Sequence, residues 1–410
     1  MKGKWFFSMV CAFILGLGWS ASWADEFPEH LTFTALITTP RAIEGLTGDN
    51  ARNLYTGGAA ITALGDKFCP VWRISLSSSS LVLVGKLPLP CSPLGIAFND
   101  TGDLFVADGA NAKIWKFTPN AGTPPNAITF AAGVPGANGV AFDRNGNLWT
   151  GDGVTGQGRV WEIAPCATPP CSVTEVFRIQ PMRNGTALGG NISSIPTANQ
   201  PTQGVGRSAN TFPHTAAGGN PQDLVANGIV FNQEGDMFVI DTARGALWKV
   251  KFDRYGNLES PTGCDTTFTT NTLCLSNVFV AHPILEGGDG IALDRAGNIW
   301  VDANERNAVA VVTNEGRVLE IFRNPVNSAG LRNSADTALG NTRILEFPTS
   351  PFLSEKVFCT AQSDGNRRDN FPRSDGQIDG GNTTGTGKDL GKISCMEQEL
   401  TIQGLPLPIR

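Results

Sequence analysis

The sequence has little charge and no excess of basic residues. Of its 410 residues, 31 are Lys or Arg and 37 are Asp or Glu, so the formal net charge is −6 and the pI is near 5.2. Nucleic-acid-binding surfaces need a basic patch, so we set this class of function aside. Hydrophobic residues make up 41% of the chain, which allows a sizeable buried core and excludes a disordered protein.

Long hydrophobic runs are absent beyond the first 24 residues. The N-terminus combines the basic residues Lys2 and Lys4, a short apolar run over 9–17, and a small-x-small site at Ser22-Trp23-Ala24. This pattern is typical of a signal peptide over 1–24, with a mature chain that starts near Asp25. We therefore expect an exported protein, periplasmic or secreted, with no stable membrane insertion after cleavage. An uncleaved membrane anchor is the alternative.

The cysteines contain no Cys-x-x-Cys pair, so their spacing does not favour a zinc site. Removal of Cys11 with the leader leaves eight, and an even number in an exported chain indicates disulfides. Eight cysteines allow 105 connectivities, so the pairing stays open, as does a set of free buried thiols. Neighbours in the sequence favour the pairs Cys69–Cys91, Cys166–Cys171, Cys264–Cys274 and Cys359–Cys395.

One seventeen-residue pattern recurs along the chain. Each copy has two short apolar segments around a polar turn that contains Gly, and a third segment such as AKIWKF (112–117) follows. Alternating apolar residues around such turns predict β-hairpins. The copies are PLGIAFNDTGDLFVADG (93–109), ANGVAFDRNGNLWTGDG (137–153), ANGIVFNQEGDMFVIDT (226–242) and GDGIALDRAGNIWVDAN (288–304).

The period of the repeat predicts an all-β, six-bladed β-propeller. The opening glycines Gly95 and Gly139 lie 44 residues apart, and a period in the forties with about four strands is typical of a propeller blade. Degenerate copies at 42–58 and 341–360 flank the four clear ones, which gives six blades. We expect residues 25–410 to form one domain whose terminal units meet to close the ring.

Two segments interrupt the period. Residues 182–226 are rich in Gly, Asn, Thr and Pro and predict a long surface insertion between the third and fourth blades. Loops of this length are functional lids or simply mobile segments, and both interpretations stay open. Residues 363–388 predict a loop within the last blade, held by Cys359 and Cys395.

The residue before each opening glycine enters the innermost strand of its blade, and in a propeller these positions ring one mouth of the central channel. Two carboxylates and two carboxamides at one mouth suit a hard cation, most simply Ca²⁺, with Mg²⁺, Mn²⁺ or Zn²⁺ as alternatives. The competing interpretation is that Asn and Asp before Gly are turn formers. The ring positions are Glu44, Leu94, Asn138, Asn227 and Asp289, with Asn341 as the expected sixth.

Two further aspartate patterns predict structure rather than metal binding. The runs DRNGN (143–147) and DRAGN (294–298) lack the downstream Glu of an EF-hand, so we interpret them as hairpin turns. The aspartates late in the second segments are expected to bond neighbouring loops, and one or two of them could support the site. These are Asp108, Asp152, Asp241 and Asp302.

The order of Glu44-Gly45, Asn138-Gly139, Asn227-Gly228 and Asp289-Gly290 at blades one, three, four and five resembles one family. It is the family of senescence marker protein (regucalcin), gluconolactonase and luciferin-regenerating enzyme. Its members are six-bladed propellers with one divalent cation at the channel mouth. The resemblance implies that Glu44, Asn227 and Asp289 ligate the cation, while Asn138 contacts substrate or completes the ligand set. It also implies that Asp289 is the general base in hydrolysis of a lactone.

The sequence departs from that family at several points. Gly139 stands where many members have an acidic residue, and Glu44-Gly45-Leu46 replaces the Glu-x-Pro of the lactonases. The 182–226 insertion and the disulfides also differ from the cytosolic members. We therefore expect a metal-dependent hydrolase of a small-molecule lactone or related ester, with the substrate open. The alternative is a non-catalytic propeller of the NHL type that binds a ligand or protein; a strictosidine synthase-like enzyme is disfavoured.

Overall fold

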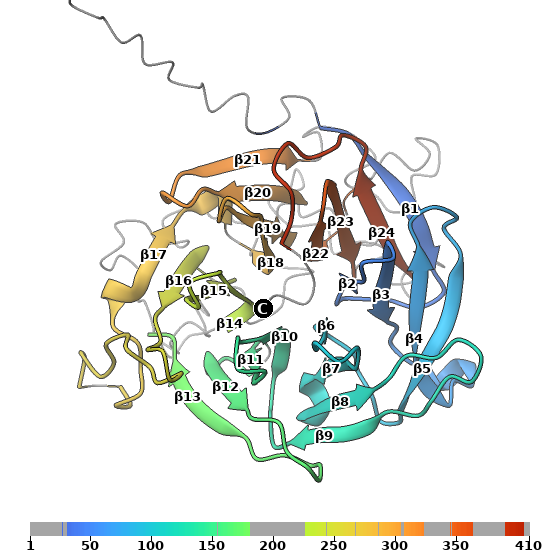
Figure 1. The fold of residues 1–410 in the computed structure, drawn as a ribbon, viewed down its shortest axis with the longest axis horizontal. Helices are drawn as coiled ribbons and strands as arrows, with labels where there is room; N and C mark the ends of the chain where they lie inside the picture. The colour runs from blue at the N-terminus through green and yellow to red at the C-terminus, as the bar shows by residue number, and fades with distance from the viewer. Residues whose placement is uncertain are drawn as a thin grey trace, which may run out of the picture.

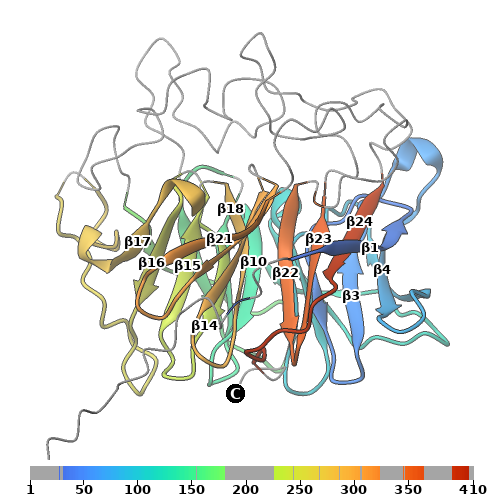
Figure 2. The same cartoon turned by 90° about the horizontal axis from the view of Figure 1, so that it is seen from above.

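A computed structural model describes residue 27 and residues 31–405, except 154, 181–225, 243, 267, 286, 305–306, 324–344, 346 and 364–389. Figure 1 shows six sheets arranged radially around a central axis, as the repeat predicts, and in the side view of Figure 2 the inner strands run roughly along this axis. Each sheet has four antiparallel strands, and the first strand of each blade lies next to the axis. The fold is therefore an all-β, six-bladed propeller. The predicted signal peptide lies outside the described residues.

The strands of the first three blades follow one another directly in the sequence. Blade one is β2 (Thr47–Gly48), β3 (Asn53–Gly57), β4 (Phe68–Ser75) and β5 (Leu81–Pro88). Blade two is β6 (Ile96–Phe98), β7 (Leu104–Asp108), β8 (Lys113–Phe117) and β9 (Ile128–Ala132). Blade three is β10 (Ala137–Phe142), β11 (Leu148–Asp152), β12 (Arg159–Ile163) and β13 (Thr174–Arg178).

The last three blades include one strand from the other end of the chain. Blade four is β14 (Ala226–Phe231), β15 (Met237–Asp241), β16 (Ala246–Val250) and β17 (Val278–Ala281). Blade five is β18 (Gly288–Leu293), β19 (Ile299–Ala303), β20 (Ala308–Val312) and β21 (Val318–Arg323). Blade six is β22 (Pro348–Ser354), β23 (Val357–Gln362), β24 (Gly391–Met396) and the N-terminal β1 (Phe33–Thr39). Short 3-10 turns lie at Thr62–Leu64, Gly109–Asn111, Leu275–Asn277 and Pro283–Leu285.

The N-terminal strand closes the ring. Strand β1 pairs antiparallel with β24, with Phe33 opposite Met396 and Thr39 opposite Gly391. The last blade is therefore built from both ends of the described chain (Figure 1). This pairing fulfils the expectation that the terminal units meet, and it ties the N-terminal segment to the C-terminal segment by backbone hydrogen bonds.

The core is divided among the gaps between blades. Within the described ranges, the buried apolar residues form six clusters, and each cluster joins one pair of adjacent blades. Trp149 of blade three, for example, packs with Phe231 and Met237 of blade four. Each sheet thus buries both faces, which explains why strands such as Ile299–Ala303 have no exposed residue.

The hairpin turns depend on aspartate side chains, as the DRNGN and DRAGN runs predict. Asp143 Oδ1 accepts the backbone N–H groups of Asn145 and Asn147 at 2.8 and 2.9 Å. Its Oδ2 accepts Nε1 of the buried Trp149 at 3.1 Å. Asp294 repeats these contacts in blade five, where Trp300 Nε1 lies 3.1 Å from Oδ2. The carboxylates therefore fix the turns and anchor a core tryptophan.

The structure forms all four disulfides that sequence neighbours favour, and they lie in blades one, three, four and six. Disulfides in this number are typical of an oxidising, extracellular compartment. Cys359 and Cys395 face each other across β23 and β24, and they bracket the loop predicted over 363–388, which lies outside the described residues beyond Ser363. No helix in the described part of the chain is long and apolar enough to cross a membrane.

The described chain leaves blade three at Gln180 and re-enters at Ala226 in blade four, which is where the long insertion was expected.

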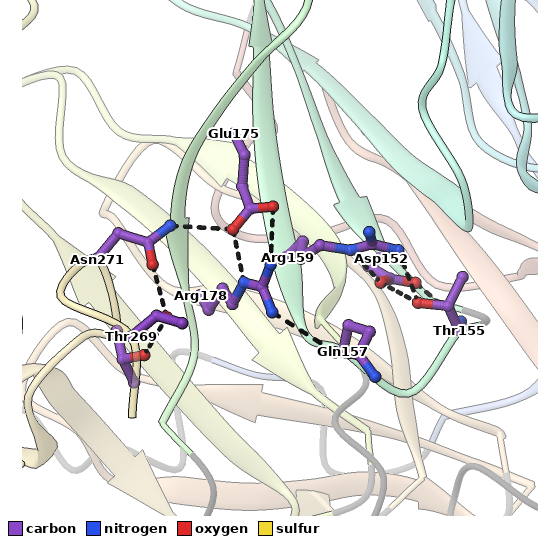
Figure 3. Close-up of polar contacts among 9 residues, drawn as sticks. Asp152, Thr155, Gln157, Arg159, Glu175, Arg178, Thr269 and Asn271 are labelled. Carbon is purple, nitrogen blue, oxygen red and sulfur yellow. Dashed lines mark hydrogen bonds and ion pairs between the residues drawn. The ribbon is translucent and has the colours of Figure 1, made fainter. Parts of the chain in front are cut away.

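A polar network links the two blades at this junction (Figure 3). Glu175 accepts Arg178 Nε at 2.5 Å and Asn271 Nδ2 at 2.9 Å. Backbone bonds between Arg178 and the 271–273 segment reinforce it. The two blades are thus held together independently of the inserted residues.

Candidate functional site at the channel mouth

A β-bulge places three of the four candidate side chains at the start of their innermost strands, while Glu44 directly precedes the first strand of blade one. In blade three, Ala137 pairs with Asp152 and Val140 with Thr150, so Asn138 and Gly139 together face one residue of β11. The same shift in register occurs at Asn227 in blade four and at Asp289 in blade five. Bulges of this kind re-aim side chains next to functional sites. Here they occur at every one of these three predicted positions.

Close backbone packing explains the glycine that follows each of these residues. A Cβ atom on Gly139 would lie 2.5 Å from the carbonyl oxygen of Asn227, and one on Gly228 would lie 2.5 Å from that of Asp289. The same close approach continues from blade to blade: a Cβ on Gly45, Gly95 or Gly290 would collide with the carbonyl oxygen of Leu94, Asn138 or Thr349, respectively. Only glycine leaves room for this approach. The contacts show that the six positions form one ring around the axis.

The sixth ring position is Thr349, and the expectation of Asn341 is wrong. Asn341 itself lies outside the described residues. Thr349 is buried, and its Oγ1 donates to the backbone oxygen of Glu44 at 2.8 Å, which connects the last blade to the first. Blade six lacks a glycine after this residue, since Ser350 occupies the position. That departure from the repeat hid the residue in the sequence.

Four carboxylate and carboxamide side chains lie in this ring. Asn138 lowers the pKa of the nearby Glu44 carboxyl, and Asn227 lowers that of Asp289. Asn138, Asn227 and Asp289 are only 7, 6 and 5% exposed, while Glu44 is partly accessible. The structure therefore brings together the four residues that the sequence singled out. Of the other two ring residues, Thr349 bonds the Glu44 backbone, and Leu94 packs against the core between blades two and three.

The two carboxyl groups are electrostatically strained. Burial raises the pKa of Glu44 to about 7, and the hydrogen bond from Asn138 only partly opposes this shift. Burial and the charge of Glu44 together raise the pKa of Asp289 well above its usual value. Hydrogen bonds from Asn304 and Asn227 act in the opposite direction. Two carboxylates that disfavour each other's ionisation in a buried ring would be stabilised by a cation.

An apolar layer underlies the ring. The residue two positions after each ring residue lines a cavity of about 150 Å³ along the axis. Leu405, near the described C-terminus, lines the same cavity, and its N–H bonds Leu293 at the far end of β18. The cavity below the polar mouth thus has a largely apolar lining, which also includes Thr47. The lining residues in ring order are Leu46, Ile96, Val140, Ile229, Ile291 and Pro351.

Two contacts to the ring could not be found from the repeat. Asn304 Nδ2 donates to Asp289 Oδ2 at 2.9 Å, and Asn227 Nδ2 donates to Thr242 Oγ1 at 3.2 Å. Thr242 and Asn304 each directly follow the second strand of their blade. The sequence places them at one position of the repeat, but only the register of the strands shows that this position reaches the ring.

Asp302 does not belong with the other late aspartates, contrary to expectation. Asp152 and Asp241 pair with the residue before the bulge, but in blade five Ala303 takes that place. Asp302 is one residue earlier and therefore faces the other side of its strand. Its Oδ2 accepts Thr360 Oγ1 of blade six at 2.5 Å. Burial raises its pKa well above the usual value, and its charge raises the pKa of Asp289.

The other three late aspartates have the structural role that was expected. Asp108 Oδ2 accepts Trp115 Nε1 at 2.9 Å, and Asp108 Oδ1 accepts the Asn111 amide. Asp152 forms an ion pair with Arg159, 3.1 Å from Oδ2 to Nε. Asp241 contacts Arg244 in the same way at 3.4 Å. Each carboxylate fixes the loop that follows its own strand, and none of these partners belongs to the ring.

The donor set fits a hard divalent cation. Carboxylate and carboxamide oxygens are the ligands that Ca²⁺ and Mg²⁺ prefer, and Glu44, Asn138, Asn227 and Asp289 supply both kinds. Across the described ranges, no group of three or more His, Cys, Asp or Glu side chains could hold a metal ion. A site here would therefore depend on its two asparagines as well as on Glu44 and Asp289. The raised pKa values of the two acids are the signature of a ring arranged for positive charge.

Comparison with protein families gives two matches. The model described as "SMP-30/Gluconolactonase/LRE-like region" matches residues 219–330, which include Asn227 and Asp289 but not Glu44 or Asn138. The NHL repeat model matches residues 91–117 in blade two. The resemblance inferred from the order of the ring residues is thus confirmed over these blades. A search of curated proteins found no match.

Solved structures with the same fold include a putative gluconolactonase, with 14% identity over 93% of this chain and 97% of that chain, at a TM-score of 0.51. A luciferin-regenerating enzyme is 12% identical over 92% and 98%, at a TM-score of 0.52. The calcium-binding protein regucalcin from Agrobacterium tumefaciens is 15% identical over 92% and 97%, at a TM-score of 0.52. At these identities the similarity shows a shared fold.

Proposed function

We propose that this chain is an exported, metal-dependent hydrolase that opens a small-molecule lactone or related ester at the channel mouth. The family match over residues 219–330 supports a lactonase-type hydrolase. The single observation that carries the proposal is the meeting of Glu44 and Asp289 in one ring, where burial raises the pKa of both acids and the charge of Glu44 further raises that of Asp289. The apolar N-terminal run and the four disulfides support export.

Glu44, Asn227 and Asp289 are the proposed cation ligands, and Asn138 contacts the substrate or completes the ligand set. A bound cation, most simply Ca²⁺ with Mg²⁺, Mn²⁺ or Zn²⁺ as alternatives, would polarise the ester carbonyl and stabilise the charge that develops on its oxygen. Hydrogen bonds from Asn227 to Thr242 and from Asn304 to Asp289 already hold two of these side chains in place. Such fixed groups need little reorganisation during the reaction.

Asp289 is the proposed general base. A bound cation would favour the ionised form of its carboxyl group, and this form can accept a proton from water. Asn304 holds one carboxylate oxygen by a 2.9 Å hydrogen bond, which orients the group. The residues below the ring are largely apolar, so the substrate and the attacking water would bind on the side of the polar mouth.

A second candidate function is a non-catalytic propeller that binds a ligand or protein partner. The match of blade two to the NHL repeat favours it, because NHL repeats build binding platforms. The buried carboxylates argue against it, since a platform has no need of them. The two functions differ in whether hydrolysis depends on Asp289.

The test combines metal analysis with hydrolysis assays on the purified mature protein. We expect stoichiometric binding of a divalent cation, and hydrolysis of at least one compound from a panel of lactones and esters. Asp289→Asn should abolish hydrolysis and keep the fold. The matched control is Asp236→Asn, which removes a carboxylate paired with Lys249 at 2.9 Å in the hairpin at the far end of the blade-four sheet. No cation uptake in the millimolar range, or full activity of Asp289→Asn, would overturn the proposal in favour of the binding platform.

A further inference from the structure

The position directly after the second strand contacts the ring in three successive blades. It is Gly153 in blade three, Thr242 in blade four and Asn304 in blade five, as the strand register shows. Thr242 and Asn304 are buried, with 2% and 3% of their surfaces exposed. Each hydrogen-bonds the ring residue of its own blade, Asn227 or Asp289 respectively.

The contact with Thr242 determines which way the Asn227 carboxamide faces. Its nitrogen donates to Thr242 Oγ1 at 3.2 Å. Because the amide is planar, its oxygen is turned away from Thr242 and is left to accept another partner. Without the threonine hydroxyl, the nitrogen loses this anchor.

Blade three shows what happens where this position has no side chain. A Cβ on Gly153 would lie 2.5 Å from Asn138 Nδ2, so the side chain of Asn138 fills the space that a residue here would need. Asn138 instead acts on Glu44, whose pKa it lowers. The side chain at this position thus differs from blade to blade. It is missing beside Asn138, it accepts a hydrogen bond from Asn227, and it donates one to Asp289.

We propose that Thr242 and Asn304 are positioning residues, which hold the Asn227 carboxamide and the Asp289 carboxylate in the orientation that cation binding requires. The inference rests on the proposed function, because it assigns these two residues a role toward the same cation site. Neighbours of this kind, which orient the ligands of a metal, commonly change its affinity 10- to 100-fold when they are replaced.

Calcium titration of the full-length mature protein tests the assignment to Thr242. Thr242→Val keeps the shape of the side chain and removes the hydroxyl, and we expect it to weaken Ca²⁺ binding by about 10- to 100-fold. Thr242→Ser keeps the hydroxyl and should bind Ca²⁺ nearly as well as wild type. Thr150→Val is the matched control, since Thr150 is a fully buried strand residue whose Oγ1 has no hydrogen-bond partner among the residues that the structure describes. It should bind Ca²⁺ as wild type does.

Asn304→Ala provides the second arm and should also lose about 10- to 100-fold in Ca²⁺ affinity. Thermal unfolding of each variant in chelator separates positioning from a general loss of stability. An affinity loss without a matching fall in the melting temperature supports the proposal. Wild-type affinity in both Thr242→Val and Asn304→Ala would overturn it, and so would an equal loss in Thr150→Val.

Crystal structures of chelated wild type and Thr242→Val distinguish this inference from the proposed function. If the wild type takes up no Ca²⁺, the cation-dependent function fails, and the structures alone decide the role of Thr242. A carboxamide of Asn227 that turns in Thr242→Val then supports positioning, while an unchanged carboxamide overturns it. If the wild type binds Ca²⁺ and Thr242→Val binds it equally well, the function stands and the positioning role is wrong.

Discussion

Removing divalent cations should make the stability of this protein fall as the pH rises. Glu44 has a pKa of about 7 in the folded chain, against an ordinary value of 4.5. Between these two values the folded protein keeps a proton that the unfolded chain has released. Raised pH therefore favours the unfolded state, so the stability present below pH 4.5 is lost as the pH rises through 7.

The expected size of the effect follows from the pKa values. A difference between 4.5 and about 7 corresponds to roughly 3 kcal/mol in the free energy of unfolding, and partial access of Glu44 to solvent makes this an upper value. Asp289 changes stability in the same direction, since its pKa is also raised.

In Glu44→Gln the ring carries one acid fewer, so the variant should be more stable than wild type at pH 8 in chelator. Excess Ca²⁺ at about 100 times the dissociation constant should return about 2.7 kcal/mol to wild type and little to the variant.

Urea unfolding at pH 5, 6, 7 and 8 measures these differences, with and without Ca²⁺. Glu315→Gln is the control, because Glu315 is an exposed residue in the turn between β20 and β21. Its unfolding free energy should follow that of wild type at every pH. The reasoning fails if wild type in chelator is equally stable at pH 5 and pH 8. It also fails if the loss of stability persists undiminished in Glu44→Gln.

Three further predictions concern the scaffold. Gly228→Ala should lower the free energy of unfolding in urea by about 1–3 kcal/mol, because its Cβ would lie 2.5 Å from the Asp289 carbonyl oxygen. The control Gly122→Ala should change this free energy little, since a Cβ there has no neighbour closer than 3.5 Å. Replacing Cys359 and Cys395 by Ala should lower the melting temperature more than replacing Cys166 and Cys171, because loops of 36 and 5 residues correspond to about 4 and about 2 kcal/mol of unfolded-state entropy; equal shifts would contradict this. Asp302→Asn should be more stable than wild type at pH 8 and equal to it near pH 4, since burial raises the pKa of Asp302. A difference in unfolding free energy between the two proteins that does not decrease as the pH falls would refute the argument.

The blades were predictable because the repeat encodes local chemistry. Turns such as 143–147 form through contacts between residues two to six positions apart, so the sequence pattern contains all the participants. The glycine of each copy also has a local signature, although its cause is the carbonyl of the next blade. Blade six was harder to define, since Thr349-Ser350 lacks that glycine and β1 joins the sheet from 305 or more residues away.

The four oxygen-bearing ring residues were also predictable, since one repeat position holds them all. Their partners were not. Thr242 and Asn304 reach the ring only because a bulge shifts the register of the inner strands by one residue. Asp302 stands one position earlier in its copy of the repeat than Asp152 and Asp241 do in theirs, and the strand register shows that this turns it to the other side of its strand. Bulges leave no clear mark in a pattern of alternating residues, so register had to come from the structure.

The ring position itself tolerates side chains of very different chemistry. Leu94 and Thr349 occupy it in blades two and six, and the backbone contacts of the ring continue through both. The propeller therefore does not need a carboxylate at Glu44 or Asp289 in order to close. Two acids at these positions instead destabilise the cation-free fold at neutral pH, because burial raises the pKa of both and the charge of Glu44 further raises that of Asp289. An unfavourable arrangement at positions where the fold would accept neutral residues is best explained by function, and the proposed cation would relieve it.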